Sequence, residues 1–339
     1  MINTRHLGAT RLLLPELGFG AAALGNLYHP VTEEQAQSIL ELAWTSGFRY
    51  FDTAPHYGQG LSERRIGDSL RQHRGRDYIL STKAGRLLKP ATYASERHGF
   101  HSPMPFDIHY DYSYDGVMRS FEDSLQRLGL ARIDILLMHD IGAATHGNRH
   151  EELFDIAMSG GYRAMSELRE QGLVKAIGLG VNEYQVCEAA MEHGNWDCFL
   201  LAGRYTLLEQ DALDSFLPKC EQRNCSVVIG GAYNSGILAT GTKAGVTPHY
   251  NYAPALPREI HRVKQLEMVC ERYRIPLPAA ALQFPLAHPA VASVIPGIGS
   301  TRHVTQTLSL MNTRIPADFW RELRSHGLVH PQAPLPGGV

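Results

Sequence analysis

Four side chains that together can transfer a proton stand where apolar stretches of this sequence end. The stretch that starts at Phe48 runs into Asp52 and Tyr57, a carboxylate and a phenol. A later stretch ends in Lys83, and another ends in His139. An ordinary phenol has a pKa near ~10, so it is a poor proton acceptor at neutral pH. Because a cation beside the phenol oxygen lowers that pKa, the set predicts a proton-transfer site centred on Tyr57.

Each member of the set has a distinct expected role. Tyr57 is the acid and base, Lys83 supplies a positive field at its oxygen, and Asp52 holds Lys83. His139 forms a hydrogen bond to the reacting oxygen and orients it. An isolated histidine at a strand end is more often structural, and an isolated buried Asp–Lys pair is usually only an ion pair. Four such residues at strand ends favour catalysis over these structural explanations.

These residues need a scaffold that brings distant strand ends together. Eight apolar stretches alternate with helical ones, and the expected strands are residues 17–21, 50–52, 78–83, 133–139, 174–180, 198–202, 226–229 and 291–295. In a (β/α)8 barrel the C-terminal ends of the strands converge on one open face. The alternation therefore predicts an α/β fold, a single-domain TIM barrel over residues 1–339, with an N-terminal hairpin of residues 10–14 and 17–21.

The alternative architecture is an open doubly wound sheet that binds a dinucleotide. It requires G-x-G-x-x-G directly after the first strand, but Gly18-Phe-Gly20 is followed by Ala23, so the barrel is favoured. Two stretches are too long for simple connections, and we expect residues 84–113 and 230–257 to be long active-site loops. Residues 84–113 show neither the helix period nor the strand period.

The overall composition argues against several classes of protein. A net charge of −2 over 339 residues offers no electrostatic attraction to nucleic acid or to an anionic membrane. No secretory leader pattern and no apolar run near ~18 residues is apparent, so we expect a cytoplasmic protein without a membrane segment. Five cysteines without a C-x-x-C pair, and histidines without a fixed ligand spacing, predict neither disulfides nor a metal site. The expected partner is a small polar substrate, bound by a monomer or homodimer.

The motifs that carry the four side chains resemble those of the aldo-keto reductase family. The matching stretches are Phe51-Asp-Thr-Ala-x-x-Tyr57-Gly, Ser81-Thr-Lys83 and Leu136-Leu-Met-His139. The resemblance covers nearly the whole chain and implies the same barrel. It places the family's catalytic tetrad on Asp52, Tyr57, Lys83 and His139. It also implies a nicotinamide cofactor that exchanges hydride with a carbonyl or alcohol carbon held against Tyr57 and His139.

The resemblance also assigns residues to the cofactor. Asn182 matches an asparagine that holds the nicotinamide amide, whereas Val181 departs from the usual serine. The aromatic residue that commonly stacks on nicotinamide after strand seven is missing, and Tyr233 is the candidate to replace it. The loop that lines the pyrophosphate matches Asn234, Ser235, Gly236 and Leu238, where a glycine permits close approach of the backbone. The adenosine end falls on Gly297, Thr301, His303 and Gln306.

The adenosine end bears on the choice between NAD and NADP. Family members that prefer NADP usually carry a lysine or arginine at the positions matching Gly297 and His303, where it holds the 2′-phosphate. A phosphate dianion buried without cationic partners is costly. We therefore expect NAD, with NADP as the alternative through Arg302 or His303.

Polar side chains around the expected pocket favour a hydroxylated substrate. His56, Asp140 and Tyr28 are the expected substrate contacts, and Asp140 alternatively caps the segment that follows it. Three further stretches resemble the aldose 1-dehydrogenase branch of the family, which acts on L-fucose and other threo sugars and has L-galactose and pyridoxal 4-dehydrogenases as relatives. These stretches are Met138-His-Asp-Ile-Gly142, Ala202-Gly-Arg-Tyr-Thr206 and Tyr233-Asn-Ser-Gly-Ile-Leu238.

The branch implies one shared reaction, the oxidation of a cyclic hemiacetal to a lactone. The leading expectation is NAD-dependent oxidation at the anomeric carbon of an aldose such as L-fucose or L-galactose. Oxidation of pyridoxal to 4-pyridoxolactone is the second, and general aldehyde or ketone reduction is the third. An expectation from a different class is a non-catalytic barrel subunit, which should tolerate Tyr57→Phe; the intact tetrad argues against it.

Overall fold

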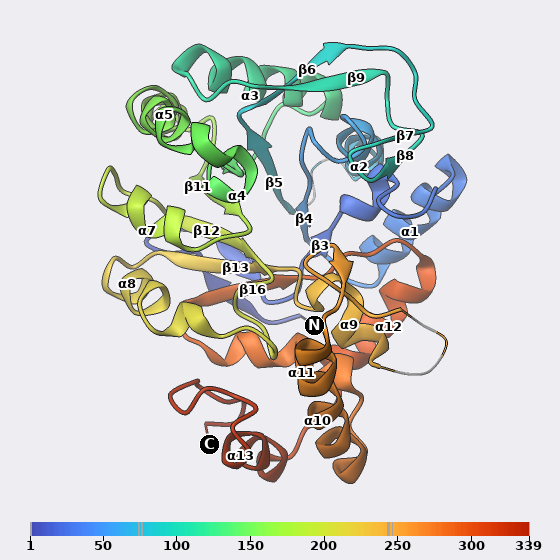
Figure 1. Cartoon of the computed structure of the whole chain (residues 1–339). Coiled ribbons are helices and arrows are strands. Elements are labelled where there is room, and N and C mark those ends of the chain that lie inside the picture. The colour runs from blue at the N-terminus through green and yellow to red at the C-terminus, as the bar shows by residue number, and fades with distance from the viewer. Residues whose placement is uncertain (1, 74, 76, 243–244, 246, 339) are drawn as a thin grey trace.

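Eight parallel strands form a barrel-shaped sheet at the centre of the protein, with helices around it (Figure 1). The computed structural model describes residues 2–73, 75, 77–242, 245 and 247–338. The strands are β3 (Phe19–Gly20), β4 (Tyr50–Asp52), β5 (Ile79–Ala84), β10 (Ile135–His139), β11 (Ala176–Val181), β12 (Cys198–Ala202), β13 (Ser226–Gly230) and β16 (Val291–Ile295). They lie side by side in chain order, and single bridges between Leu17 and Val294 and between Gly20 and Gly297 close the ring. The predicted (β/α)8 barrel is confirmed.

Helices connect the strands and cover the outside of the barrel. They are α1 (Glu33–Thr45), α2 (Leu61–Gln72), α3 (Tyr114–Leu128), α4 (Ala143–His146), α5 (His150–Ile156), α6 (Tyr162–Glu170), α7 (Gln185–Met191), α8 (Phe216–Gln222), α9 (Ile237–Thr240), α10 (Pro257–Tyr273), α11 (Leu277–Gln283), α12 (Thr301–Met311) and α13 (Ala317–Ser325). The first begins as expected, because the Thr32 hydroxyl accepts a hydrogen bond from the Gln35 backbone N–H and the Gln35 side chain accepts one from the Thr32 backbone N–H.

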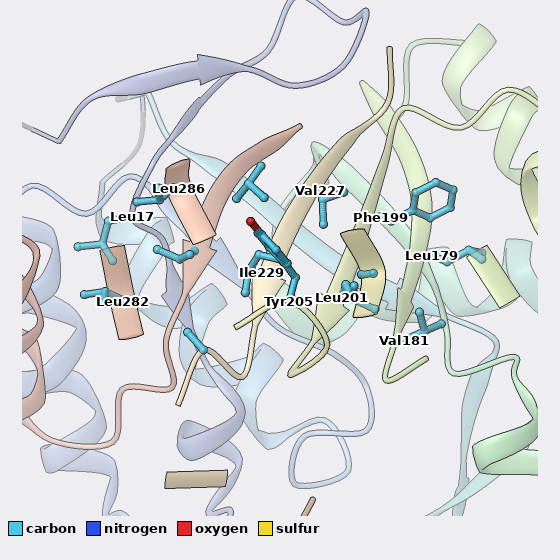
Figure 2. Packing of buried hydrophobic residues seen from close by; sticks show 14 of the residues in the cluster. Leu17, Leu179, Val181, Phe199, Leu201, Tyr205, Val227, Ile229, Leu282 and Leu286 are labelled. Atoms are coloured by element: carbon cyan, nitrogen blue, oxygen red, sulfur yellow. The ribbon is translucent and has the colours of Figure 1, made fainter. Parts of the chain in front are cut away.

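Alternate residues of each strand belong to two different apolar layers. On β12, Phe199 and Leu201 pack in the layer between the sheet and the outer helices, as Figure 2 shows. Leu200 belongs to the second layer inside the barrel, together with Ile135 and Leu137 of β10. Each such buried side chain contributes roughly 2 kcal/mol relative to exposure. Because successive strand residues point to opposite faces, the residue two places after Leu137, which is His139, also points inward.

The N-terminal hairpin exists, but its expected strands are wrong. Strand β1 (Thr4–His6) pairs antiparallel with β2 (Leu13–Pro15), and residues 17–21 instead lead into the first barrel strand. The hairpin places Leu7, Leu12 and Leu14 against the inner layer of the barrel. Strand β1 could not be predicted from the sequence, because its residues are exposed or half-buried and the strand therefore lacks an apolar face.

The two long connections contain more regular structure than their sequences show. In residues 84–113, β6 (Arg86–Pro90) pairs antiparallel with β9 (Phe106–Tyr110), and β7 (Glu96–Arg97) pairs with β8 (Phe100–His101). In residues 230–257, β14 (His249–Tyr250) pairs with β15 (Ala253–Pro254). These strands are mostly exposed, so neither face demands an apolar residue at every second position.

Candidate active site

Three of the four predicted catalytic residues lie at the C-terminal ends of neighbouring strands. Asp52 is the last residue of β4 and His139 the last of β10, and Lys83 lies on β5 between them. Lys83 is only 1% exposed, and its Nζ donates hydrogen bonds to Asp52 Oδ2 at 2.8 Å and to the Thr53 carbonyl at 2.9 Å. The barrel therefore buries the cation against its carboxylate, as the sequence predicts.

Gly180 on β11 makes room for the lysine. A Cβ atom at this position would stand 3.2 Å from Cε of Lys83, which is tighter than ordinary van der Waals contact. The flanking Leu179 and Val181 point into the outer layer, where their side chains pack against helices (Figure 2). The glycine on the inward-facing position of β11 is thus a requirement of the site.

Tyr57 lies beside the lysine, and two opposing influences act on its pKa. Lys83 Nζ stands 4.7 Å from the centroid of the Tyr57 ring. Burial raises the pKa of Tyr57, and Lys83 lowers it through its charge and a hydrogen bond, but the net shift is upward. The predicted influence of Lys83 on this pKa has the expected direction, but desolvation of the phenolate outweighs it in the net shift.

The backbone of Tyr57 packs directly against the 3₁₀ turn Ala22–Gly25. A Cβ atom on Gly25 would stand 2.5 Å from the Tyr57 carbonyl carbon, so only glycine permits this approach. Phe100 of β8 packs beside the phenol, with ring centroids 6.3 Å apart. Sequence reasoning missed Phe100, which is 2% exposed and anchors residues 84–113 onto the site.

His139 is 6% exposed and lies edge-on to Tyr57, with ring centroids 6.2 Å apart. Burial lowers the pKa of His139 well below its ordinary value, and the nearby Arg86 and Lys83 cations lower it further. The imidazole is therefore neutral at physiological pH and can donate through one ring nitrogen while accepting through the other. Within the described residues, its Nδ1 has no hydrogen-bond partner.

His56, an expected substrate contact, joins the same group of rings. Its centroid lies 5.9 Å from that of His139 and 5.2 Å from that of Phe100. Burial and the nearby Arg86 lower the pKa of His56 to about 2, so it too is uncharged. Its Nδ1 is buried and unpartnered among the described residues, which leaves it available to a ligand.

Asp140, an expected substrate contact, holds two protein groups. Its Oδ2 forms an ion pair with Arg86, and its Oδ1 accepts a hydrogen bond from Asn182 Nδ2 at 3.2 Å. The capping alternative is wrong, since α4 starts after Gly142 and the Glu183 carboxylate accepts the Ala144 backbone N–H instead. Asp140 is thus a bridge between neighbouring elements.

Arg86 is a second residue that sequence reasoning missed. It is 4% exposed and follows Lys83 closely in the chain, at the start of β6. The sequence did carry a signal, because Arg86 lies three residues after Lys83 at the same strand end. Charged side chains are seldom buried without a partner, so a second cation there indicates a buried acid nearby.

The structure brings a tyrosine from the second long connection over the predicted nicotinamide residue. The Tyr252 hydroxyl donates to Asn182 Oδ1 at 3.4 Å, and the Tyr252 backbone N–H donates to Ser235 Oγ at 2.9 Å. Tyr28, the third expected substrate contact, is 48% exposed. Burial raises the pKa of Tyr252, and the nearby phenols of Tyr57 and Tyr28 raise it further. Tyr252 had no sequence signal, because its connection lacks a periodic pattern.

Tyr233, the proposed stacking residue, is half-buried against the outer apolar layer. Burial raises its pKa to about 12, and its hydroxyl has no partner in the described part of the chain. The ring is therefore held by the protein core, while the Tyr252 ring is 65% exposed.

The loop matched to the pyrophosphate has a tightly turned, left-handed backbone. Asn234, Ser235 and Gly236 have φ angles of 44°, 58° and 104°, three successive left-handed residues before α9. The Asn234 side chain is occupied by Thr206 and the Gly203 carbonyl. The backbone N–H groups of Asn234 and Gly236 donate to the carbonyls of Gly231 and Tyr233 within the same loop. Leu238 is fully buried and supports the loop from beneath.

The adenosine end has open space where a cofactor is expected. No atom lies within 4 Å of the place a Cβ on Gly297 would take. Helix α12 starts just beyond it, with the Ser300 hydroxyl accepting the His303 backbone N–H at 3.1 Å. Thr301, His303 and Gln306 are exposed on its first turns. The N-terminus of a helix can bind a phosphate, and the open space beside Gly297 leaves room for a cofactor that carries one.

A closed barrel carries an acid, a phenol, an ammonium and an imidazole at its C-terminal rim, the groups of a proton-transfer enzyme. Residues 16–327 match the Aldo/keto reductase family, and the chain belongs to this family. Pyridoxal 4-dehydrogenase of Microbacterium luteolum is 46% identical over 96% of this chain and 97% of its own length. D-threo-aldose 1-dehydrogenase of a Pseudomonas species is 38% identical over 95% of this chain and 96% of its own.

A solved structure supports the same assignment. An aldo-keto reductase from Bacillus halodurans in its holo form matches with a TM-score of 0.73 and 25% identity, covering 97% of each chain. The predicted family resemblance and barrel are confirmed, and members of the family use a nicotinamide cofactor. In the described part of the chain, no helix is long and apolar enough to cross a membrane, and no cluster of three His, Cys, Asp or Glu side chains is suited to a metal ion.

Proposed function

We propose that this protein oxidises the cyclic hemiacetal of a small polar substrate to a lactone, with NAD as acceptor and Tyr57 as the acid and base. The observation that carries the proposal is the buried Asp52–Lys83 pair beside Tyr57, at a distance of 4.7 Å from Lys83 Nζ to the ring centroid. Neutral His139 lies edge-on to the phenol, with ring centroids 6.2 Å apart, and can bind the same substrate oxygen.

The residues act on the hydroxyl of the hemiacetal. His139 holds the reacting oxygen by a hydrogen bond, and the Tyr57 phenolate accepts the hydroxyl proton. Lys83 stabilises the phenolate, and Asp52 and the Thr53 carbonyl keep the ammonium in place. The bound nicotinamide supplies the hydride acceptor and, in its oxidised form, a positive charge that favours the phenolate. In the reverse direction Tyr57 is the phenol and donates the proton.

The relatives favour pyridoxal as the first substrate to test and an aldose as the second. This order reverses the sequence-based one, since identity to the Microbacterium luteolum pyridoxal 4-dehydrogenase is 46% and to the Pseudomonas D-threo-aldose 1-dehydrogenase 38%. Both kinds of substrate carry a hydroxyl that closes on an aldehyde to give a cyclic hemiacetal. The rings of His56, Phe100 and Tyr57 beside the site suit a flat heteroaromatic substrate.

NAD is the proposed cofactor. The two positions where a cation would hold a 2′-phosphate are Gly297 and His303, and burial together with Arg302 lowers the pKa of His303, so it is neutral at physiological pH. Arg302, exposed on the first turn of α12, offers a fixed charge at this end. We also propose a cytoplasmic location and a monomer or homodimer of one barrel domain.

The test is a panel of initial rates with pyridoxal, L-fucose and L-galactose, each with NAD and with NADP, followed by identification of the product. We expect NAD reduction with at least one of the three and a lactone as product. A free carboxylic acid formed without lactone, or activity only as an aldehyde or ketone reductase, would overturn the proposal.

A further inference from the structure

A turn after β5 delivers Arg86 to the inside of the site. Gly85 adopts φ +93°, and a Cβ there would stand 2.3 Å from the Tyr112 ring. The chain therefore turns tightly against Tyr112, and the next residue directs its guanidinium to Asp140. The Tyr112 hydroxyl in turn donates to the His139 carbonyl at 2.8 Å, which fixes the backbone just before Asp140.

Asp140 links this arginine to both functional groups of the predicted reaction. The residue adopts φ +47°, and its backbone N–H donates to the Gly180 carbonyl at 3.0 Å. Its Oδ2 faces Arg86 and lies 3.4 Å from His139 Nε2. Its Oδ1 accepts the Asn182 amide N–H. The Asp140 carboxylate therefore contacts both His139, the expected substrate-binding imidazole, and Asn182, the expected cofactor-binding amide.

The hydrogen bond from Asn182 fixes which way its amide points. Because Nδ2 donates to Asp140, Oδ1 faces the other way, where the Tyr252 hydroxyl reaches it. An acceptor in that position suits the carboxamide N–H of a nicotinamide. If Asp140 were displaced, Asn182 would lose the partner that sets this orientation, and if Asp140 were protonated, the hydrogen bond would lose its charge and weaken.

Asp140 depends on Arg86 for its charge. Burial raises the pKa of Asp140, and Arg86 is the strongest influence that lowers it. The other ionisable groups around it come from several elements: Lys83 on β5, Glu183 after β11, His139 on β10, His146 on α4, and the phenols of Tyr57, Tyr112 and Tyr252. Arg86 is 4% exposed, so solvent screens this pair little.

We propose that Arg86 is a positioning residue for cofactor binding and for catalysis, acting through Asp140 on the amide of Asn182 and on the imidazole of His139. The catalytic half of this inference rests on the proposed function. The cofactor half rests only on family membership and can be measured without turnover.

The test compares Arg86→Met, Arg86→Lys, Asp140→Asn and the double variant Arg86→Met/Asp140→Asn with the wild type. Arg97→Met is the matched control, because Arg97 lies in the same long connection but donates only to the carbonyls of Phe106 and Thr92. Binding of NADH is measured by the fluorescence of the bound cofactor from about pH 6 to 9, and folding by the thermal midpoint.

We expect Arg86→Met to weaken NADH binding about tenfold, with Arg86→Lys between it and the wild type, because lysine keeps the charge but not the planar fork. Binding to Arg86→Met should fall further as the pH drops, because Asp140 becomes protonated. The double variant should show no such pH dependence and should bind no more weakly than Arg86→Met. Where Arg86→Met does not fold, Asp140→Asn is expected to show a loss of NADH binding in its place, and Arg86→Lys a smaller loss.

Equal NADH affinity in the wild type, Arg86→Lys and Asp140→Asn would overturn the inference. So would effects of Arg86→Met and Asp140→Asn that add fully in the double variant, since residues acting through one contact are not additive. Failure of the proposed function would give a different result from failure of this inference. A wild type that binds NADH with this pattern but oxidises no hemiacetal would refute the reaction and leave the role of Arg86 in cofactor binding intact.

Discussion

Lys83 Nζ stands 4.7 Å from the centroid of the Tyr57 ring, with the lysine buried on β5 and the tyrosine half-buried in the connection after β4. This contact influences the protonation state of Tyr57 and hence the pH dependence of oxidation and of reduction. Burial raises the pKa of Tyr57 more than Lys83 lowers it, so the resting side chain is a phenol. Oxidation needs the phenolate, and its rate should therefore increase with pH through the alkaline range, whereas reduction uses the phenol and should not need alkaline pH.

Lys83→Met should move that increase to higher pH. The substitution removes the cation that lowers the pKa of Tyr57, so kcat for oxidation at pH 8 should fall by about 10²- to 10⁴-fold. It also leaves Asp52 buried without its partner, at a cost of about 3–5 kcal/mol. The measurement is kcat against pH for both variants. An unchanged pH profile would show that Lys83 has no influence on the catalytic base.

Gly180→Ala should disturb the lysine without adding or removing a charge. The new methyl group would stand 3.2 Å from Lys83 Cε, and such crowding of a packed interior costs about 1–3 kcal/mol. We expect a lower thermal midpoint and a kcat reduced about tenfold, with little change in the NAD dissociation constant. A variant that keeps full kcat would mean that Lys83 tolerates displacement.

Gly297→Arg should change the preference for cofactor. No atom lies within 4 Å of a Cβ at Gly297, so the side chain can be added without strain on the fold. An arginine there offers a fork that matches a 2′-phosphate, and NADP binding should strengthen about tenfold relative to NAD. Titrations of both cofactors against the variant check this. An unaltered ratio would place the adenosine end elsewhere.

Tyr252→Ala should weaken the binding of cofactor while leaving stability unchanged. The ring is 65% exposed and its hydroxyl reaches Asn182 Oδ1, the predicted contact for the nicotinamide amide. We expect the NAD dissociation constant to increase several-fold, roughly the loss of one aromatic contact. Leu256→Ala is the control, since Leu256 is 57% exposed in the same region. Equal binding by both variants would exclude a role for Tyr252.

The barrel and its catalytic end were predictable because they follow periodic rules. Inward-facing positions on a strand alternate, so Asp52, Lys83 and His139 at apolar strand ends were expected to meet, and they do. The strands β6 to β9 were not predictable, since exposed strands carry no apolar alternation. The opposing effect of burial on the Tyr57 pKa was also missed, because burial depth is a property of the packed fold.

Arg86 and Tyr252 were missed for a related reason. Each acts on a partner far away in the chain: Arg86 on Asp140, and Tyr252 on Asn182. Neither contact leaves a local pattern in the sequence. The predicted substrate contact at Asp140 illustrates the same limit, because the chemistry of a carboxylate was evident while its partners were not.

The most direct test of the central claim is the initial rate of NAD reduction by Tyr57→Phe with pyridoxal, L-fucose and L-galactose. Tyr114→Phe is the matched control, because it removes a phenol hydroxyl that binds Glu167 on the outer helices. We predict that Tyr57→Phe loses at least about 10²-fold in kcat on the substrate that the wild type oxidises, while its NADH affinity and the activity of Tyr114→Phe stay unchanged. Undiminished turnover by Tyr57→Phe would contradict the assignment of Tyr57 as acid and base.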